Sequence, residues 1–456
     1  MILLPRTRFK TIHMVGIGGS GMSGIAEILH RMGFKVQGSD ISRKATTLRL
    51  ERLGIKVFYG HRYENVRGAD LVVYSSAIPP DNPELQAAKD MGIPVVQRAE
   101  MLAELMRVKF SIAVSGAHGK STTTSMIGHI LKALGTNPTV IVGGILREVS
   151  TGGMYGSGDY LVAEADESDR SFLKLLPTVA IITNIDREHI DTYGSMANLK
   201  MAFIDFANRV PFYGAVLACG DDENTRHIFP FVEKRLFTYG LGGENFIRAE
   251  NLNLDGLTSE YDLVVGDERV GRVRLNVPGR FNVLNSLAAL GVAWELGLDL
   301  KDASESLGDF KGVGRRFELK GKVNGATVID DYGHHPTEIR EVLNVAKRLG
   351  KVAVVFQPHR YTRTKDLYKQ FAEVLAGANH VILLPIYPAG EKEIPGVSSQ
   401  LIYDHLVRMG YDSIDLVSSL KEAAERVRRI ADEGWVVLLQ GAGDVYKVWE
   451  HLEGSA

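Results

Sequence analysis

The stretch Phe110-Ser-Ile-Ala-Val-Ser-Gly116-Ala117-His118-Gly119-Lys120-Ser121-Thr122-Thr123 decides the fold of this chain. An apolar run stops at a glycine, Gly-Lys-Ser follows, and Thr124 to Leu134 is predicted to be helical. This order is typical of a site for a nucleotide triphosphate, because the N–H groups of the loop and the helix N-terminus face the phosphates. The loop is shorter than the general pattern, which leaves about four residues between the first glycine and Gly-Lys. A plain strand–helix turn with an exposed lysine is the alternative.

The composition is typical of a soluble enzyme. The chain has 456 residues, 45% of them hydrophobic and 24% charged, and a formal net charge of −2, so we expect two to four domains and no nucleic-acid partner. The single cysteine, Cys219, excludes an internal disulfide framework and fits a reducing compartment. We find no secretory signal and no apolar run near the roughly 20 residues of a membrane span. The expectation is a cytoplasmic protein without a membrane partner.

Strand-like apolar runs alternate with helical patterns over most of the chain, which predicts an α/β protein with parallel sheets. We expect three domains, at residues 1–108, 109–312 and 313–456. The first and the third are predicted to be Rossmann-like. The central one is predicted to be a P-loop ATPase-type parallel sheet, with a small antiparallel insert between about residues 245 and 278.

The first domain carries a second glycine-rich loop. Gly16-Ile-Gly18-Gly19-Ser20-Gly21 follows a predicted strand, Thr11–Val15, and precedes a predicted helix, Met22–Met32. Asp40 ends the next predicted strand, as in a dinucleotide fingerprint. The loop is compatible with NAD, with the diphosphate of a nucleotide sugar, or with a tight packing turn. A separate triphosphate loop downstream favours the diphosphate-bearing substrate over the hydride cofactor.

Acidic residues follow two predicted strands of the central domain. One group is Glu164-Ala-Asp166-Glu167-Ser-Asp169, and the other is Asp186-Arg-Glu188-His189-Ile-Asp191. An ATP–Mg²⁺ site needs a carboxylate near the phosphates, although a solvated acidic loop is the alternative. His189 is either a metal ligand or a structural histidine. Asn282 and Asn285 head an apolar helix, where either can be an N-cap or early-turn residue or can contact a base, and the spacing favours the cap.

The third domain has three polar stretches of interest. Arg315-Arg316 lies at the presumed domain junction, where a cation can reach phosphates on domain closure or form a plain surface pair. His334-His335 follows Asp330-Asp331, but it lacks the ligand spacing of a zinc site, so we do not expect zinc. Gln357–Arg363 holds two arginines that can bind a carboxylate, or that form a basic turn.

Together these stretches resemble the Mur ligase family of peptidoglycan synthesis, essentially from end to end. The resemblance is carried by His13–Glu27, Gly116–Thr124, Glu164–Asp169, Asp331–Pro336, Phe356–Thr364, Tyr387–Glu391 and Gly441–Asp444. The short loop before Lys120 is a mark of the family, and the first-domain signature is similar to its alanine-adding type. The resemblance implies an ATP-dependent amide ligase that joins L-alanine to UDP-N-acetylmuramate through an acyl phosphate, giving ADP and phosphate. Such an enzyme serves cell-wall biogenesis, cell shape and cell division.

The resemblance also implies roles for individual residues. UDP-sugar binding falls to Gly18, Gly19, Ser20, Asp40, His61, Ser75 and Ser76. ATP binding falls to Gly116, His118, Gly119, Lys120, Ser121, Thr122, Asn282, Arg316, Asp331 and His334. One Mg²⁺ is assigned to Ser121 or Thr122, and a second to Glu167 and His189. Tyr332, Arg360 and Arg363 are assigned to L-alanine, and the catalytic residues are Lys120, His189 and Arg316.

The chain departs from the family pattern at four positions. Ala117 and Ser121 stand where threonines are usual, Glu188 where aspartate is usual, and Phe281 where histidine is common. Ser121 keeps the hydroxyl and Glu188 keeps the charge, so we expect the chemistry to survive. Sister ligases use a carbamylated lysine near the second metal, but the offset of Lys200 from His189 does not fit that role.

Three other functions remain open at this point. The protein could ligate a murein tripeptide to the same nucleotide sugar, act as a nucleotide-dependent switch, or bind NAD through the first glycine loop as a dehydrogenase. The sequence is compatible with a monomer or a homodimer.

Overall fold

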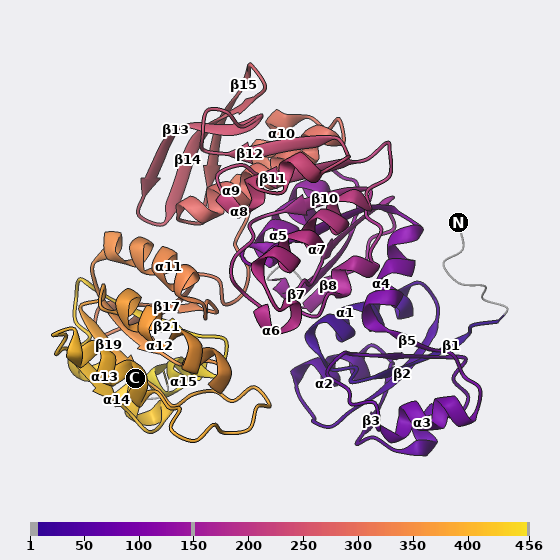
Figure 1. The fold of residues 1–456 in the computed structure, drawn as a ribbon, viewed down its shortest axis with the longest axis horizontal. Coiled ribbons are helices and arrows are strands. Elements are labelled where there is room, and N and C mark those ends of the chain that lie inside the picture. The colour runs from indigo at the N-terminus through magenta and orange to yellow at the C-terminus, as the bar shows by residue number, and fades with distance from the viewer. Residues whose placement is uncertain (1–7, 147–150, 454–456) are drawn as a thin grey trace. The chain divides into compact units, whose positions relative to one another are not determined.

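The computed structural model describes residues 8–146 and 151–453. The chain forms three α/β sheets that follow one another along the sequence (Figure 1). These sheets belong to two compact units, which are described separately below. The first unit extends to Val313, except for Leu254–Ser259 and Val277–Phe281, which belong with Gly314–Ala456 in the second.

The N-terminal sheet is parallel and has the order β3-β2-β1-β4-β5. Its strands are β1 (Thr11–Val15), β2 (Lys35–Asp40), β3 (Lys56–Tyr59), β4 (Leu71–Tyr74) and β5 (Val95–Gln97). Its helices are α1 (Ser20–Arg31), α2 (Ala45–Arg52), α3 (Pro83–Asp90) and α4 (Arg98–Arg107), with the short 3₁₀ helix η1 (Tyr63–Val66). Helix α1 buries Met22, Ile25 and Leu29, which share one face because they are three or four residues apart. It starts at Ser20, two residues before the predicted start.

The central sheet has the order β15-β14-β13-β12-β11-β10-β6-β9-β7-β8. Its parallel part contains β6 (Phe110–Ser115), β7 (Thr139–Leu146), β9 (Tyr160–Glu164), β10 (Val179–Ile182), β11 (Ala215–Cys219), β12 (Leu236–Gly240) and β13 (Ile247–Asp255). Strand β8 (Thr151–Met154) pairs antiparallel with β7. The main helices are α5 (Lys120–Ala133), α7 (Met196–Asn208), α9 (Arg280–Glu295) and α10 (Leu300–Ser306). Helix α5 starts at Lys120, earlier than predicted.

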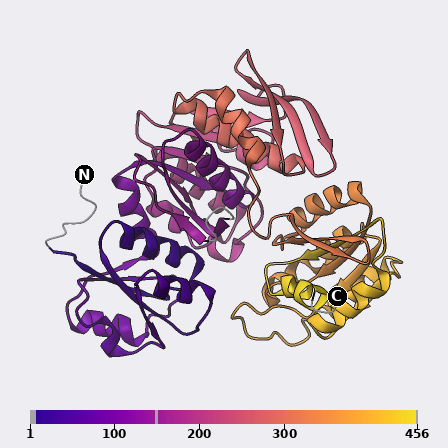
Figure 2. The same cartoon turned by 180° about the vertical axis from the view of Figure 1, so that it is seen from behind.

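The predicted antiparallel insert is formed by β13, β14 (Thr258–Val265) and β15 (Glu268–Leu275). Two residues connect β13 to β14, and two connect β14 to β15. Connections as short as these can join only strands that run antiparallel to each other. In Figure 2 these strands extend beyond the helices of the central domain, at the edge of the sheet.

The C-terminal sheet has the order β16-β17-β21-β18-β19-β20. Its strands are β16 (Glu318–Val323), β17 (Ala326–Asp331), β18 (Lys351–Phe356), β19 (His380–Leu383), β20 (Ile414–Leu416) and β21 (Trp435–Gln440). Its helices are α11 (Pro336–Leu349), α12 (Tyr361–Leu375), α13 (Gln400–Arg408), α14 (Leu420–Ile430) and α15 (Val448–Glu453). The four predicted strands pair in parallel as expected. Strand β16 was not predicted, although Asn324-Gly325, with φ of 49° and 87°, is a strong hairpin signal.

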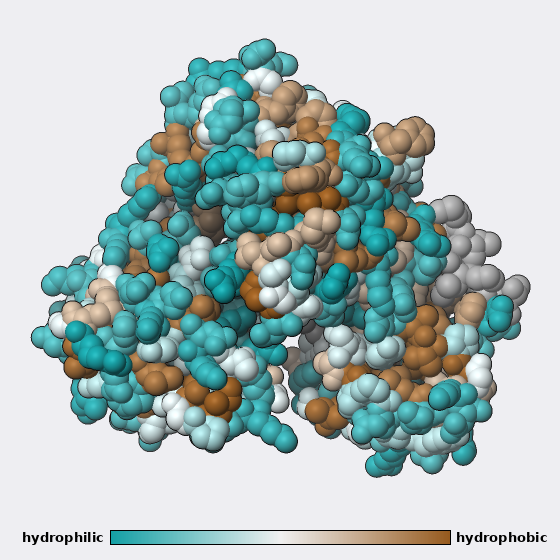
Figure 3. Space-filling view, in the orientation of Figure 1, coloured by the Kyte–Doolittle hydropathy of each residue, from teal (hydrophilic) through white to brown (hydrophobic). Residues whose placement is uncertain are grey.

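On the face drawn in Figure 3 hydrophilic side chains predominate and hydrophobic ones form small separate groups. Among the helices of the described residues, none combines the length and the apolar character that crossing a membrane requires.

Inside the first unit, helix α1 packs against the β7–β8 hairpin through glycines. A Cβ atom on Gly24 would lie 2.9 Å from the carbonyl oxygen of Gly152, and one on Gly153 would lie 2.9 Å from Cα of Gly24. The backbones of the N-terminal and central domains therefore approach each other as closely as glycine allows.

We predict that Gly24→Val destabilises the protein, because the backbone of Gly152 cannot move aside as a flexible side chain can. Overpacking of this kind costs about 1–3 kcal/mol. The measurement is the free energy of unfolding in urea. Gly243→Val is the control, since a Cβ atom there would meet nothing within 4 Å. Equal stability of the two variants would contradict the close approach.

Candidate functional site

The glycine loop of the N-terminal domain is shaped by Asp40. The backbone N–H of Gly18 donates to Oδ2 of Asp40 at 3.0 Å, and the backbone N–H of Ser42 donates to Oδ1 at 3.0 Å. The ammonium of Lys44 lies 3.5 Å from Oδ2. A Cβ on Gly18 would be 2.7 Å from the same oxygen, so only glycine fits. Both oxygens of Asp40 are thus used by the chain itself, and its direct effect is on the shape of the loop.

The other predicted UDP-sugar residues lie at the same edge of this sheet. Ser75 and Ser76 follow β4, and His61 follows β3, close to Ser39 of β2. In a parallel sheet the carboxyl ends of neighbouring strands meet at one edge, which is where such folds bind ligands. Ser20 begins α1, but its side chain lies outside the described residues.

A cation at this edge was not predicted. Arg98 is the first residue of α4, directly after β5, and its Nη1 lies 2.9 Å from the position of a Cβ on Gly21. It also faces the central domain. Burial alone would raise the pKa of Asp166. The charge of Lys120, the hydrogen bonds from Ser168 and the charge of Arg98 together lower this pKa, so Arg98 acts on an acid of the central domain. Strand β5, which places Arg98 at this edge, has three residues and was not predicted, so no local pattern pointed to this cation.

The triphosphate loop of the central domain is held by the residues that follow β10. Thr183 Oγ1 donates to the carbonyl of His118 at 2.6 Å, and the side chain of Asn184 both donates to and accepts from the backbone of His118. Gly116 has a φ of 133°, and a Cβ there would collide with Thr183. Gly119 has a φ of 84° and is packed against Asn285 of α9. Glycine is therefore required at both ends of this short loop.

Lys120 is the central cation of this site. Its Nζ donates to the carbonyls of Gly116 at 2.6 Å and Ala117 at 3.2 Å, and lies 3.0 Å from Oε1 of Glu167. Burial opposes the charge of Lys120, but Glu167 and the neighbouring acids raise its pKa above the ordinary value. Burial also raises the pKa of Glu167 to about 7, against the opposing charge of Lys120. Lys120 is therefore a fixed positive charge whose side chain is largely shielded from water.

Beside Lys120 lies a group of possible metal ligands. Ligand atoms of Glu167, Glu188 and His189 are within 4.8 Å of one another. Within the described part of the chain, Oε2 of Glu167 is buried and has no hydrogen-bond partner. Two carboxylates and an imidazole with such a vacant buried oxygen fit a divalent cation. Glu188 was not predicted as a ligand, although its place next to His189 was a signal.

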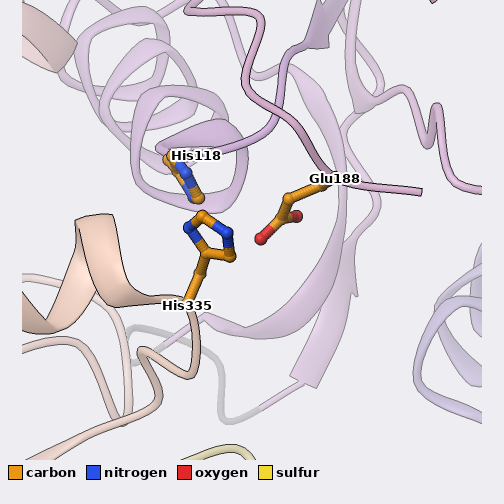
Figure 4. Close-up of side chains that lie close together, drawn as sticks. All are labelled: His118, Glu188 and His335. Carbon is orange, nitrogen blue, oxygen red and sulfur yellow. The ribbon is translucent and has the colours of Figure 1, made fainter. Parts of the chain in front are cut away.

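Figure 4 shows Glu188 together with His118, a residue of the triphosphate loop. His118, just before α5, and Glu188, on the loop after β10, point into the same space in front of α5. The Nε2 of His118 is 3.1 Å from Oδ2 of Asp186 on that loop. The third labelled residue, His335, belongs to the second unit, where it precedes α11.

The hydroxyls after Lys120 differ in their surroundings. Ser121 Oγ donates to Oε2 of Glu164 at 2.9 Å, whereas Thr122 is 8% exposed and lies on the buried side of α5. Asn282 is the third residue of α9 and is buried beside Asn285, which accepts a hydrogen bond from Thr123. Because α9 begins at Arg280, neither asparagine is its N-cap, so the cap interpretation was wrong.

In the second unit, Arg316 and Asp331 are held by different partners. Arg316 Nη1 lies 3.2 Å from Oε1 of Glu338, and the guanidinium is 5.3 Å from the ring centre of Tyr332. Asp331 is 3% exposed, and its Oδ1 accepts from Gln440 Nε2 at 2.8 Å. Burial raises the pKa of Asp331 despite the nearby charge of Arg316.

One of the residues predicted to bind L-alanine, Arg363, lies beside a histidine that was not predicted as a site residue. Nη1 of Arg363 is 3.3 Å from Nδ1 of His359, whose ring lies 5.4 Å from that of His334 and stacks on Tyr387 at 5.7 Å. Burial lowers the pKa of His359 to about 3, so the ring is neutral and accepts from Arg363. Arg360 pairs with Glu391 at 3.1 Å.

The arrangement of a triphosphate loop, a buried lysine and adjoining acids in a three-domain α/β chain defines a class of nucleotide-dependent enzymes. The sequence matches the Mur ligase family catalytic domain at residues 11–110, the Mur ligase middle domain at 114–293 and the Mur ligase glutamate ligase domain at 315–443. The chain therefore belongs to the Mur ligase family and has its three-domain fold.

Individual relatives are similar over nearly the whole chain. The UDP-N-acetylmuramate–L-alanine ligase of Desulfatibacillum aliphaticivorans is 48% identical over 98% of both chains, and that of Geotalea daltonii is 46% identical over 98% of both. The crystal structure of UDP-N-acetylmuramate–alanine ligase from Thermotoga maritima has a TM-score of 0.83 and 32% identity, covering 97% of this chain and 98% of that one. A murein peptide ligase from Psychrobacter arcticus shares the fold, with a TM-score of 0.71 and 23% identity.

Proposed function

We propose that this protein is an ATP-dependent ligase that joins L-alanine to UDP-N-acetylmuramate in peptidoglycan precursor synthesis. The observation that carries the proposal is the triphosphate loop around Lys120, in a chain 48% identical over 98% of its length to an enzyme named for that reaction. The glycine loop around Gly18 supports a nucleotide-sugar site in the same unit. A cytoplasmic location and a monomer or homodimer remain predictions.

The proposed chemistry has two steps. The lactyl carboxylate of UDP-N-acetylmuramate attacks the γ-phosphate of ATP, which forms an acyl phosphate and releases ADP. The amine of L-alanine then attacks the acyl carbon, an amide bond forms, and phosphate leaves with the carbon–oxygen bonding electrons. The fixed charge of Lys120 stabilises the transferring phosphoryl group, because a prearranged cation needs no reorganisation during the reaction.

We propose Gly116, His118, Gly119, Lys120, Ser121 and Thr122 as the ATP loop, with Asn282 near the base. Mg²⁺, when bound by Ser121 or Thr122 and at Glu167, Glu188 and His189, would neutralise phosphate charge. Arg316, Asp331 and His334 are proposed for ATP as well, and Tyr332, Arg360 and Arg363 for L-alanine. The nucleotide sugar is assigned to the N-terminal domain, with Lys44 and Arg98 as additional cations near the glycine loop. The predicted domain limits at residues 108 and 312 remain part of this proposal.

The direct test is product analysis by mass after mixing the protein with ATP, Mg²⁺, UDP-N-acetylmuramate and one acceptor. We expect the amide product with L-alanine, together with ADP and phosphate. Glycine, L-serine and a murein tripeptide are the comparison acceptors. Product with the tripeptide alone would replace the proposal by tripeptide ligation. ATP turnover that no acceptor stimulates would favour a nucleotide-dependent switch, and tight binding of NAD would reopen the dehydrogenase interpretation.

We predict that Lys120→Ala lowers ADP release to below about one thousandth of the wild-type rate, the scale expected for loss of a phosphate-stabilising cation. Binding of UDP-N-acetylmuramate, measured by calorimetry, should survive because the glycine loop is separate. Lys132→Ala, an exposed position in the last turn of α5, is the control. Equal loss of ADP release and sugar binding would show that the two sites are not distinct.

We predict that Arg363→Ala raises the KM for L-alanine more than about tenfold, because a charged hydrogen bond to the carboxylate contributes about 1.5–3 kcal/mol. The KM for ATP should change far less. Lys365→Ala, on an exposed position of the same helix α12, is the control in the steady-state assay. A larger effect on ATP than on L-alanine would remove Arg363 from the amino-acid site.

A further inference from the structure

Glu84 of helix α3 is a fully buried acid that the proposed reaction does not use. Its exposed fraction is 0%. Both of its carboxylate oxygens have polar partners within the protein. Oε2 accepts from the hydroxyl of Ser39 at 2.5 Å and lies 3.3 Å from Nδ1 of His61 and 3.4 Å from Nε2 of His13. Oε1 accepts from the side-chain amide of Asn65 at 2.5 Å. One carboxylate thus joins β1, β2, η1 and the loop after β3.

This group is a carboxylate at neutral pH. Burial alone would raise the pKa of Glu84, but hydrogen bonds from His13, Ser39 and Asn65 lower it to about 2. A buried charge is stable only when it is paired and hydrogen-bonded, and here four side chains meet that need. The position of the carboxylate is fixed locally, because Asn82 caps α3 and accepts from the backbone N–H of Glu84 at 2.9 Å.

The network determines which way the ring of His61 faces. Nδ1 of His61 lies 3.1 Å from Oγ of Ser39, and the hydroxyl hydrogen of Ser39 is directed to Glu84. The groups facing Nδ1 are therefore acceptors, so Nδ1 carries the hydrogen and donates. Nε2 is on the opposite side of the ring, and in the neutral ring it is an acceptor. The side chain of His61 is 15% exposed, so a small part of it is accessible at the edge of the sheet.

We propose that Glu84 is a positioning residue for nucleotide-sugar binding, acting through His61. It holds the imidazole in one orientation and one tautomer, so that Nε2 accepts a hydrogen bond from an N–H or O–H group of the substrate's nucleoside. The proposal rests on the placement of the nucleotide sugar in the N-terminal domain. Asp40, the residue after Ser39 on β2, shapes the glycine loop at the same edge, so one strand end supports both parts of the site.

The test is a double-mutant cycle with Glu84→Gln and His61→Ala, assayed by steady-state kinetics. Each single variant should raise the KM for UDP-N-acetylmuramate about tenfold, while kcat and the KM values for ATP and L-alanine stay within about twofold, since one lost hydrogen bond is worth about a factor of ten. The double variant should be no worse than His61→Ala, because residues that act through each other are not additive. Glu51→Gln, an acid of the same domain that accepts from Tyr59, is the control.

A spectroscopic readout separates positioning from mere stability. Imidazole ¹⁵N shifts in histidine-labelled protein should show His61 with the hydrogen on Nδ1 in the wild type, and a mixture of tautomers in Glu84→Gln. Thermal unfolding checks that the variants are folded. Glu84→Asp, which keeps the charge but withdraws the carboxylate from His61, serves if Glu84→Gln does not fold, and it should raise the same KM.

Different failures have different meanings. A wild-type KM in folded Glu84→Gln or Glu84→Asp, with a raised KM in His61→Ala, would overturn the role of Glu84 and leave the proposed function intact. Additive losses in the double variant, or an unchanged tautomer in the glutamine variant, would overturn it as well. A wild-type KM in His61→Ala would instead show that His61 does not contact the sugar nucleotide, which corrects the proposed site itself.

Discussion

The buried ion pair between Lys120 and Glu167 is the interaction on which the central domain depends. The ammonium is 3.0 Å from the carboxylate and also bonds two carbonyls of its own loop. Removing Lys120 would leave the buried carboxylate of Glu167 without its cation, which costs several kcal/mol. The loop, the acids after β9 and the residues after β10 must therefore keep their relative positions. A protein that handles triphosphates gains a positive charge that is in place before the ligand arrives.

The same logic recurs in the other two domains. Glu84 in the N-terminal domain and Asp331 in the C-terminal domain are buried carboxylates whose oxygens are used by neighbouring elements. Each therefore holds the elements around it in place. His61, which lies beside Glu84, is the neighbour that we propose to contact the nucleotide sugar. The buried carboxylates thus hold the surrounding strands and helices in place.

Most of the regular structure was predictable because its periodicity is strong. The runs before Gly16, Gly116 and Tyr332 are apolar and end at glycines or acids, and each is a strand at its expected place. Helix starts were misplaced because Ser20 and Lys120 belong to helices whose N-caps are glycines, and glycine also marks loops. The role of Asn285 was missed for a different reason. It packs on Gly119 and Thr123, more than 160 residues away, and local patterns carry no such information.

The sequence by itself determined the family, the order of the three domains and the triphosphate loop, because these depend on residues close together in the chain. Only the tertiary structure decided that Glu188 joins Glu167 and His189, that Arg98 lies against the first turn of α1, and that His359 accepts from Arg363. The physical reason is that pairing, burial and the resulting pKa values arise where separate strand ends meet. Periodicity predicts each strand, but it does not predict which side chains of two strands share a proton, a charge or a metal.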